Sequence, residues 1–95
     1  MLNIFDEDLL YLIEKFDKEI NFSKQASKFL KKQNKQTISR IYKAIYSLPQ
    51  GDIKKLSGRA GYRLRVGNIR VIYDEYGNII DIVEIENRGQ IYKNK

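Results

Sequence analysis

The chain has 95 residues, of which 42% are hydrophobic, and a formal net charge of +6, which together indicate one small basic domain over residues 1–95. It contains no cysteine and no histidine, which excludes a disulfide framework, a thiolate or imidazole metal site and acid–base catalysis by histidine. No apolar run approaches the roughly 20 residues of a membrane span, and Met1–Asp8 lacks a secretory signal, so we expect a cytoplasmic protein without a membrane partner.

The N-terminal residues predict an acidic helix followed by a short strand. Apolar residues recur at helical spacing over residues 4–16, and acids stand in the first turn, where the helix dipole favours negative charge. Residues 18–22 alternate polar and apolar side chains, which is typical of a strand with one buried face.

The next segment predicts two helices that form a hairpin with a basic outer face. Ser23 is a suitable N-cap for the first helix. A stripe of isoleucines marks the second helix, which begins near Lys35 and ends before Pro49 and Gly51. Residues 50–61 are rich in turn residues and predict a loop.

The remaining chain predicts three antiparallel strands. Residues 62–66 and 69–73 alternate about a tight Gly67-Asn68 turn, and a Gly77-Asn78 turn precedes a strand over residues 79–86. Strands that follow a run of helices indicate an α+β fold. We expect the N-terminal helices to pack on one face of a small antiparallel β-sheet.

The basic residues are concentrated in the middle of the chain. Residues 24–70 contain thirteen Lys or Arg and a single acid, Asp52. A basic block inside a folded domain is typical of a protein that binds a polyanion. Solvated helix faces also carry lysines, so Lys28, Lys31 and Lys32 fit either interpretation when they are considered alone.

The hairpin at Gly67-Asn68 carries the most informative charge pattern. A two-residue turn places Arg65 directly opposite Arg70, an arrangement that destabilises a sheet by up to about 1 kcal/mol. A phosphate held between the two guanidinium groups would remove the repulsion. Alternatively, the carboxylate of Glu84 or Glu86 would neutralise the two arginines. We favour the phosphate because the surrounding segment is so basic.

Two further polar side chains follow the last strand, where they can reach over a sheet face. Arg88 supplies another fixed cation and Tyr92 supplies a phenol. By composition alone, a tyrosine in such a segment is more often a packing residue than a catalyst.

Four stretches of the sequence resemble the RelE/ParE superfamily of toxins from bacterial toxin–antitoxin systems. They begin at Phe22, Gly51, Gly61 and Asn87, and the resemblance covers about residues 18–93. The third stretch, Gly-Tyr-Arg-Leu-Arg-Val-Gly-Asn-Ile-Arg-Val-Ile-Tyr, is the most specific. The resemblance implies a compact fold like that of microbial ribonucleases, with a family core over residues 17–93 and an added acidic helix over residues 1–16.

The resemblance also implies an activity. Members of the RelE branch are endoribonucleases that cleave mRNA in the ribosomal decoding site, without a metal or other cofactor. Carried onto this chain, their catalytic residues are Tyr92, Arg70, Arg88, Arg65 and Arg63. Other basic residues are expected to bind RNA, namely Lys54, Lys55, Arg59, Lys28, Lys31 and Lys32. Implied partners are mRNA, the ribosome and a cognate antitoxin, which with the toxin forms a DNA-binding autorepressor complex.

Other activities fit the same sequence. A ParE-like toxin of this fold would poison DNA gyrase, and a non-catalytic nucleic-acid-binding module or co-repressor would need only the basic segment. Asn87 stands where many relatives carry histidine, so a histidine-dependent variant of the chemistry is excluded and an inactive toxin is a further alternative. The acidic residues 1–16 either form a packing helix or cover the basic face as an antitoxin would.

Overall fold

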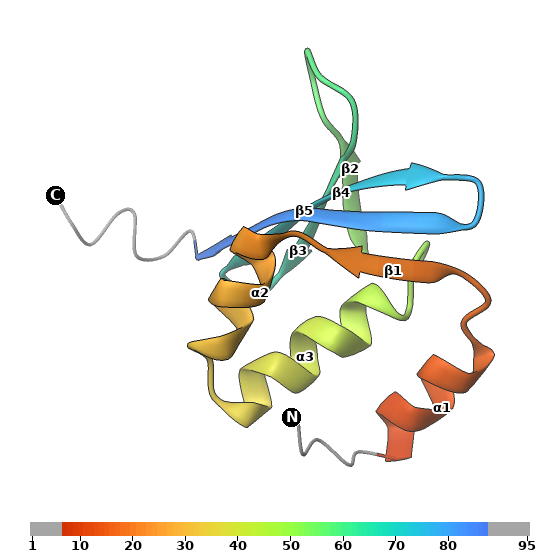
Figure 1. Cartoon of the computed structure of the whole chain (residues 1–95), viewed down its shortest axis with the longest axis vertical. Helices are drawn as coiled ribbons and strands as arrows, with labels where there is room; N and C mark the ends of the chain where they lie inside the picture. The colour runs from red at the N-terminus through yellow and green to blue at the C-terminus, as the bar shows by residue number, and fades with distance from the viewer. Residues whose placement is uncertain (1–6, 88–95) are drawn as a thin grey trace, which may run out of the picture.

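The computed structural model describes residues 7–87, which form three helices and one five-stranded sheet (Figure 1). All three helices lie on one side of the sheet, as the sequence predicted. The elements in chain order are α1 (Glu7–Lys15), β1 (Glu19–Phe22), α2 (Lys24–Lys31), α3 (Lys35–Ile45), β2 (Asp52–Lys55), β3 (Tyr62–Val66), β4 (Ile69–Tyr76) and β5 (Ile79–Asn87).

The strands are arranged in the order β1-β5-β4-β3-β2. The pairs β2–β3, β3–β4 and β4–β5 are antiparallel, whereas β1 lies parallel to β5. The expected α+β fold is therefore confirmed, with a mixed sheet. The parallel pair joins β1, the first strand of the chain, to β5, the last strand of the antiparallel meander.

The prediction of a loop over residues 50–61 was wrong for residues 52–55. These residues form β2, the edge strand that pairs with β3. Its four residues contain one apolar side chain, Ile53, between charged neighbours. An edge strand bonds to one neighbour only and is largely solvated, so its composition resembles that of a loop.

The helices begin where side chains satisfy their free backbone N–H groups. The Ser23 hydroxyl accepts a hydrogen bond from the backbone N–H of Ala26, and the Asn34 side chain accepts one from Thr37 at 2.8 Å. Helix α1 packs against α3, away from the sheet (Figure 1). The acidic side chains of α1 itself therefore lie on the helical side of the sheet.

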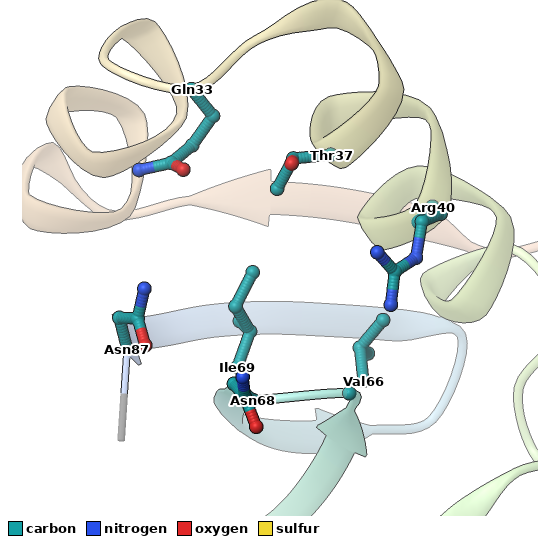
Figure 2. A pocket seen from close by; sticks show the side chains of 8 residues that line it. Gln33, Thr37, Arg40, Val66, Asn68, Ile69 and Asn87 are labelled. Atoms are coloured by element: carbon teal, nitrogen blue, oxygen red, sulfur yellow. The ribbon is translucent and has the colours of Figure 1, made fainter. Parts of the chain in front are cut away.

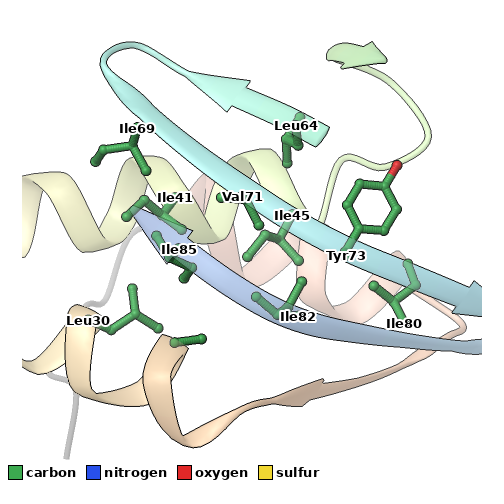
Figure 3. Packing of buried hydrophobic residues seen from close by; sticks show 11 residues of the cluster. Leu30, Ile41, Ile45, Leu64, Ile69, Val71, Tyr73, Ile80, Ile82 and Ile85 are labelled. Carbon is green, nitrogen blue, oxygen red and sulfur yellow. The ribbon is translucent and has the colours of Figure 1, made fainter. Parts of the chain in front are cut away.

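The core fills the space between α2, α3 and the sheet (Figure 3). Helix α2 contributes Leu30 and helix α3 contributes Ile41 and Ile45, while β3, β4 and β5 contribute the other large side chains of the buried cluster. A register shift leaves Val83 without a partner between the pairs Ile72–Glu84 and Tyr73–Ile82. Because of this bulge, Ile82 and Ile85 both face the core although three positions separate them, and Val83 is 37% exposed.

Candidate functional site

The sheet face opposite the helices, called the open face below, carries most of its charge on β2, β3, β4 and β5. Cross-strand partners share a face of a sheet, so the register places these side chains together. The open face includes Asp52, Lys54, Arg63, Arg65, Arg70, Ile72, Glu84 and Glu86, with Asp74 and Asp81 further along β4 and β5.

Arg65 and Arg70 are direct cross-strand partners, as the two-residue turn predicted. Gly67 has a φ of 60°, a conformation that favours glycine in such a turn. Each arginine is bound by a carboxylate on its outer neighbour. Arg65 Nε donates to Asp52 Oδ2 at 2.8 Å, and Arg70 Nε donates to Glu86 Oε2 at 2.9 Å. Asp52 and Glu86 therefore neutralise the two arginines in this structure. The sequence alone had favoured a phosphate over a carboxylate for this role.

Arg63 is the most buried of the three open-face arginines and has the longest contact with a carboxylate. Its side chain is 19% exposed, and Nη2 lies 3.9 Å from Asp52 Oδ1, which is too long for a hydrogen bond. Its Nε is buried and has no hydrogen-bond partner within residues 7–87. A buried donor without a partner costs about 1–3 kcal/mol, which a bound anion recovers if the guanidinium group turns its Nε towards that anion.

An apolar side chain lies beside this guanidinium group. Ile72 is the cross-strand partner of Arg63 on one side and of Glu84 on the other. It points away from the helices and is nevertheless only 6% exposed, because neighbouring side chains cover it. An apolar neighbour of this kind lowers the local dielectric and strengthens the interaction of Arg63 with an anion.

The other predicted RNA-binding residues do not gather on one surface. Lys54 lies opposite Arg63 on the open face, and Lys55 and Arg59 are exposed at and beyond the end of the edge strand. The three lysines of the helical layer, Lys28, Lys31 and Lys32, are exposed on and just after α2. Arg88 and Tyr92 lie outside the described residues, so their role stays a prediction.

The sequence analysis missed Asp52 as a partner of the open-face arginines. Its pairing with Arg65 follows from the register of β2 with β3, which a loop assignment cannot provide. The bulge at Val83 shifts the alternation of side chains along β5 by one position. Glu86 therefore becomes the cross-strand partner of Arg70 and binds it, whereas Glu84 lies opposite Ile72.

The phenols with shifted pKa values in the described part of the chain are poor candidates for a general base. Raised pKa values are found at Tyr42, Tyr46, Tyr73 and Tyr76. Burial is the largest cause of the raised pKa of the first three and brings that of Tyr73 to about 12. For Tyr76 the largest cause of the raised pKa is the hydrogen bond to Asp74. All four stay protonated at neutral pH.

Comparison with known proteins decides the family. Residues 20–92 match the model of the ParE toxin of the type II toxin–antitoxin system parDE. The chain belongs to the RelE/ParE family of toxins. No curated protein gives a significant match to the toxin.

Two solved structures resemble the toxin over most of its length. The RelB–RelE antitoxin–toxin complex from Methanococcus jannaschii gives 30% identity and a TM-score of 0.62, covering 78% of this chain and 96% of that chain. The RelE–RelB complex from Pyrococcus horikoshii OT3 gives 26% identity and a TM-score of 0.59, covering 77% and 97%. The resemblance inferred from the sequence is thus confirmed, as is the RelE-like fold.

Two further properties concern the described part of the toxin. No helix within residues 7–87 has the length and apolar composition needed to cross a lipid bilayer. Within the same range, no group of three or more acidic side chains is placed to hold a metal ion.

Proposed function

We propose that this toxin is a ribosome-dependent endoribonuclease that cleaves mRNA and so inhibits translation in the cytoplasm. The observation that carries the proposal is the cluster of Arg63, Arg65 and Arg70 on the open face, in which Arg63 Nε has no hydrogen-bond partner among residues 7–87. Guanidinium groups bind phosphate oxygens through paired N–H donors, which suits the scissile phosphate of RNA. The two solved relatives, both RelE proteins, support the ribonuclease branch.

The proposed reaction needs a base, an attacking hydroxyl and cations. Tyr92, as phenolate, removes the proton of a ribose 2′-hydroxyl, which attacks the adjacent phosphorus. The bond to the 5′-oxygen breaks, leaving a 2′,3′-cyclic phosphate and a 5′-hydroxyl. Arg63 and Arg65 stabilise the negative charge on the phosphoryl oxygens. Arg70 or Arg88 assists the leaving 5′-oxygen by donating the proton that makes it a hydroxyl, and solvent then restores that proton. The requirement for a 2′-hydroxyl selects RNA over DNA.

The chemistry of these side chains accounts for the proposed dependence on the ribosome. Ordinary tyrosine titrates near pH 10 and arginine above about 12, so both are poorly matched to proton transfer at neutral pH. A slow intrinsic reaction becomes effective when another surface holds the substrate in the reactive geometry. The ribosomal decoding site supplies that positioning for mRNA.

The proposal includes a cognate antitoxin as partner. Both solved relatives are complexes of a RelE toxin with a RelB antitoxin. Asp52 and Glu86 show that carboxylates can bind the open-face arginines, so acidic side chains of an antitoxin are suitable ligands for the same groups. The toxin–antitoxin complex is proposed to bind DNA and repress its own genes.

Substitution of Tyr92 tests the catalytic role. Tyr92→Phe is expected to lower mRNA cleavage in a translation reaction about 100-fold or more, because the base is lost while the ring is kept. Mapping of the 5′ ends of the mRNA measures the cleavage. Tyr11→Phe, an exposed phenol on α1, is the matched control and should cleave normally. Cleavage by Tyr92→Phe at the wild-type rate would reject Tyr92 as the base.

A gyrase poison is the second candidate, because the matching family model describes a ParE toxin. The two functions give different products in cells that express the toxin. Cut transcripts with intact DNA support the ribonuclease, whereas gyrase-trapped DNA breaks with intact transcripts support the ParE-like function. RNA binding with neither product would identify a non-catalytic binding module.

A further inference from the structure

A polar pocket lies on the helical side of the toxin, next to the turn between β3 and β4 (Figure 2). Its volume is about 270 Å³, and its walls come from the α2–α3 connection, α3, the turn and the end of β5. Val66 and Ile69 form its apolar part. Neither the family comparison nor the open-face arginines account for it.

Among residues 7–87, Arg40 is the one cation that lines the pocket. Its guanidinium group lies over Gly67, since a Cβ atom built on that glycine would stand 2.7 Å from Arg40 Nη2. Within residues 7–87, no carboxylate or other side chain pairs with the Arg40 guanidinium group. The other arginines near this turn, Arg65 and Arg70, are each bound by an acid. Within the described part of the chain, the Arg40 guanidinium group is therefore free to bind an anion.

Three carboxamide side chains accompany Arg40, namely those of Gln33, Asn68 and Asn87. Gln33 Nε2 donates to the carbonyl oxygen of Phe29 at 3.2 Å, which fixes the orientation of this amide. A carboxamide presents a donor beside an acceptor, the pattern that matches the edge of a nucleobase. A peptide carboxylate would use the donors only and would face the amide oxygens unfavourably.

We propose that this pocket binds one nucleotide of single-stranded RNA, with Arg40 on a phosphate and the carboxamides on the base edge. The proposal rests on the proposed function, because the nucleotide belongs to the strand that the open face cleaves. The same turn connects the two sites. Arg65 and Arg70 flank it on the open face, while Arg40 lies over it on the helical side. An RNA strand passing around the turn contacts both.

The size and lining of the pocket favour a nucleotide over a smaller anion. Small-molecule sites begin near about 300 Å³, which this pocket approaches, whereas a lone phosphate or carboxylate needs far less space. Val66 and Ile69 offer an apolar surface for the face of a base, as unstacked bases require.

Binding of ribonucleoside 3′-monophosphates to the full chain tests the proposal without the ribosome. We expect nuclear magnetic resonance titration to shift the Arg40 Nε–H signal and the carboxamide signals of Gln33 and Asn68. Arg40→Gln should weaken binding about tenfold, the effect of losing one charge-assisted hydrogen bond. Lys35→Gln removes the same charge from the same helix outside the pocket and should bind normally.

Other results overturn the proposal. Equal affinity for inorganic phosphate would reduce the site to a general anion site, and tighter binding of a glutamate-rich peptide would make it a protein-docking site. Unchanged affinity in Arg40→Gln would show that nucleotides bind elsewhere. These results are independent of cleavage. A toxin that cleaves mRNA but leaves the pocket signals unshifted rejects the pocket alone, whereas nucleotide binding without any mRNA cleavage rejects the proposed function alone.

Discussion

The two faces of the sheet use the same strands for different purposes. On the helical face, Val71, Ile82 and Ile85 are almost completely buried against α2 and α3. On the open face, the intervening positions of these strands carry charged side chains such as Arg70 and Glu86. Alternation along a strand allows this separation, because neighbouring residues point to opposite faces.

The two faces therefore contribute unequally to stability. Burial of a large aliphatic side chain contributes about 1.5–3 kcal/mol, whereas a surface ion pair contributes about 0–1 kcal/mol. On the open face, the Arg65–Asp52 pair is about half exposed, and Arg63 Nε has no partner among the described residues. The comparison teaches that the helical face stabilises the fold, which leaves the open face available for binding an anion.

The largest expected effect concerns the helical face. Ile85→Ala should lower the free energy of unfolding by about 2–5 kcal/mol, because Ile85 is completely buried and its removal leaves a cavity. Arg65→Ala, two strands away on the open face, should change it by less than about 1 kcal/mol. Urea denaturation followed by circular dichroism measures both variants. An equally large loss from Arg65→Ala would break the contrast between the faces.

A second prediction concerns a buried phenol of the helical face. Tyr73 is 4% exposed and stacks on Tyr62 with ring centroids 5.4 Å apart. Burial, followed by Glu75 and Tyr62, raises the pKa of Tyr73 to about 12. The folded state thus holds the neutral phenol, while the unfolded chain ionises near pH 10. The stabilisation is complete below pH 10 and is lost as the pH rises towards 12.

The measurement for Tyr73 is the free energy of unfolding between pH 9 and pH 12. Wild type should lose about 1–3 kcal/mol more than Tyr73→Phe over this interval, because the variant keeps the ring and has no ionisable phenol. Parallel profiles for the two proteins would show that Tyr73 ionisation does not contribute. The open face lacks a comparable buried phenol among its described residues, so this effect belongs to the helical face.

Local patterns explain what could be predicted from the sequence. The stripe of isoleucines placed α3 and much of the core, and the Gly67-Asn68 turn fixed Arg65 opposite Arg70. Both features depend on residues close together in the chain, where spacing determines geometry.

Features that depend on distant pairing were not predictable in the same way. Strand β2 has the composition of a loop and becomes a strand only because β3 is available to pair with it. The parallel pairing of β1 with β5 and the bulge at Val83 likewise depend on the assembled sheet. The pocket around Arg40 joins α3 to a turn more than twenty residues away, so no local motif marks it.

The smallest expected effect concerns the competition between the Asp52 carboxylate and an RNA phosphate for the open-face arginines. Asp52→Asn removes the carboxylate that binds Arg65 and lies near Arg63, and this exposed pair adds little to stability. RNA affinity at low salt should rise about threefold, because a carboxylate no longer competes with phosphate for the guanidinium groups.

Asp81→Asn is the control for this prediction. Asp81 accepts a hydrogen bond from Asn21 Nδ2 at 3.2 Å on the same face, away from these arginines. An equal rise in both variants, measured by fluorescence anisotropy, would indicate an effect of net charge alone. Weaker RNA binding by Asp52→Asn would instead show that Asp52 positions the arginines for the phosphate.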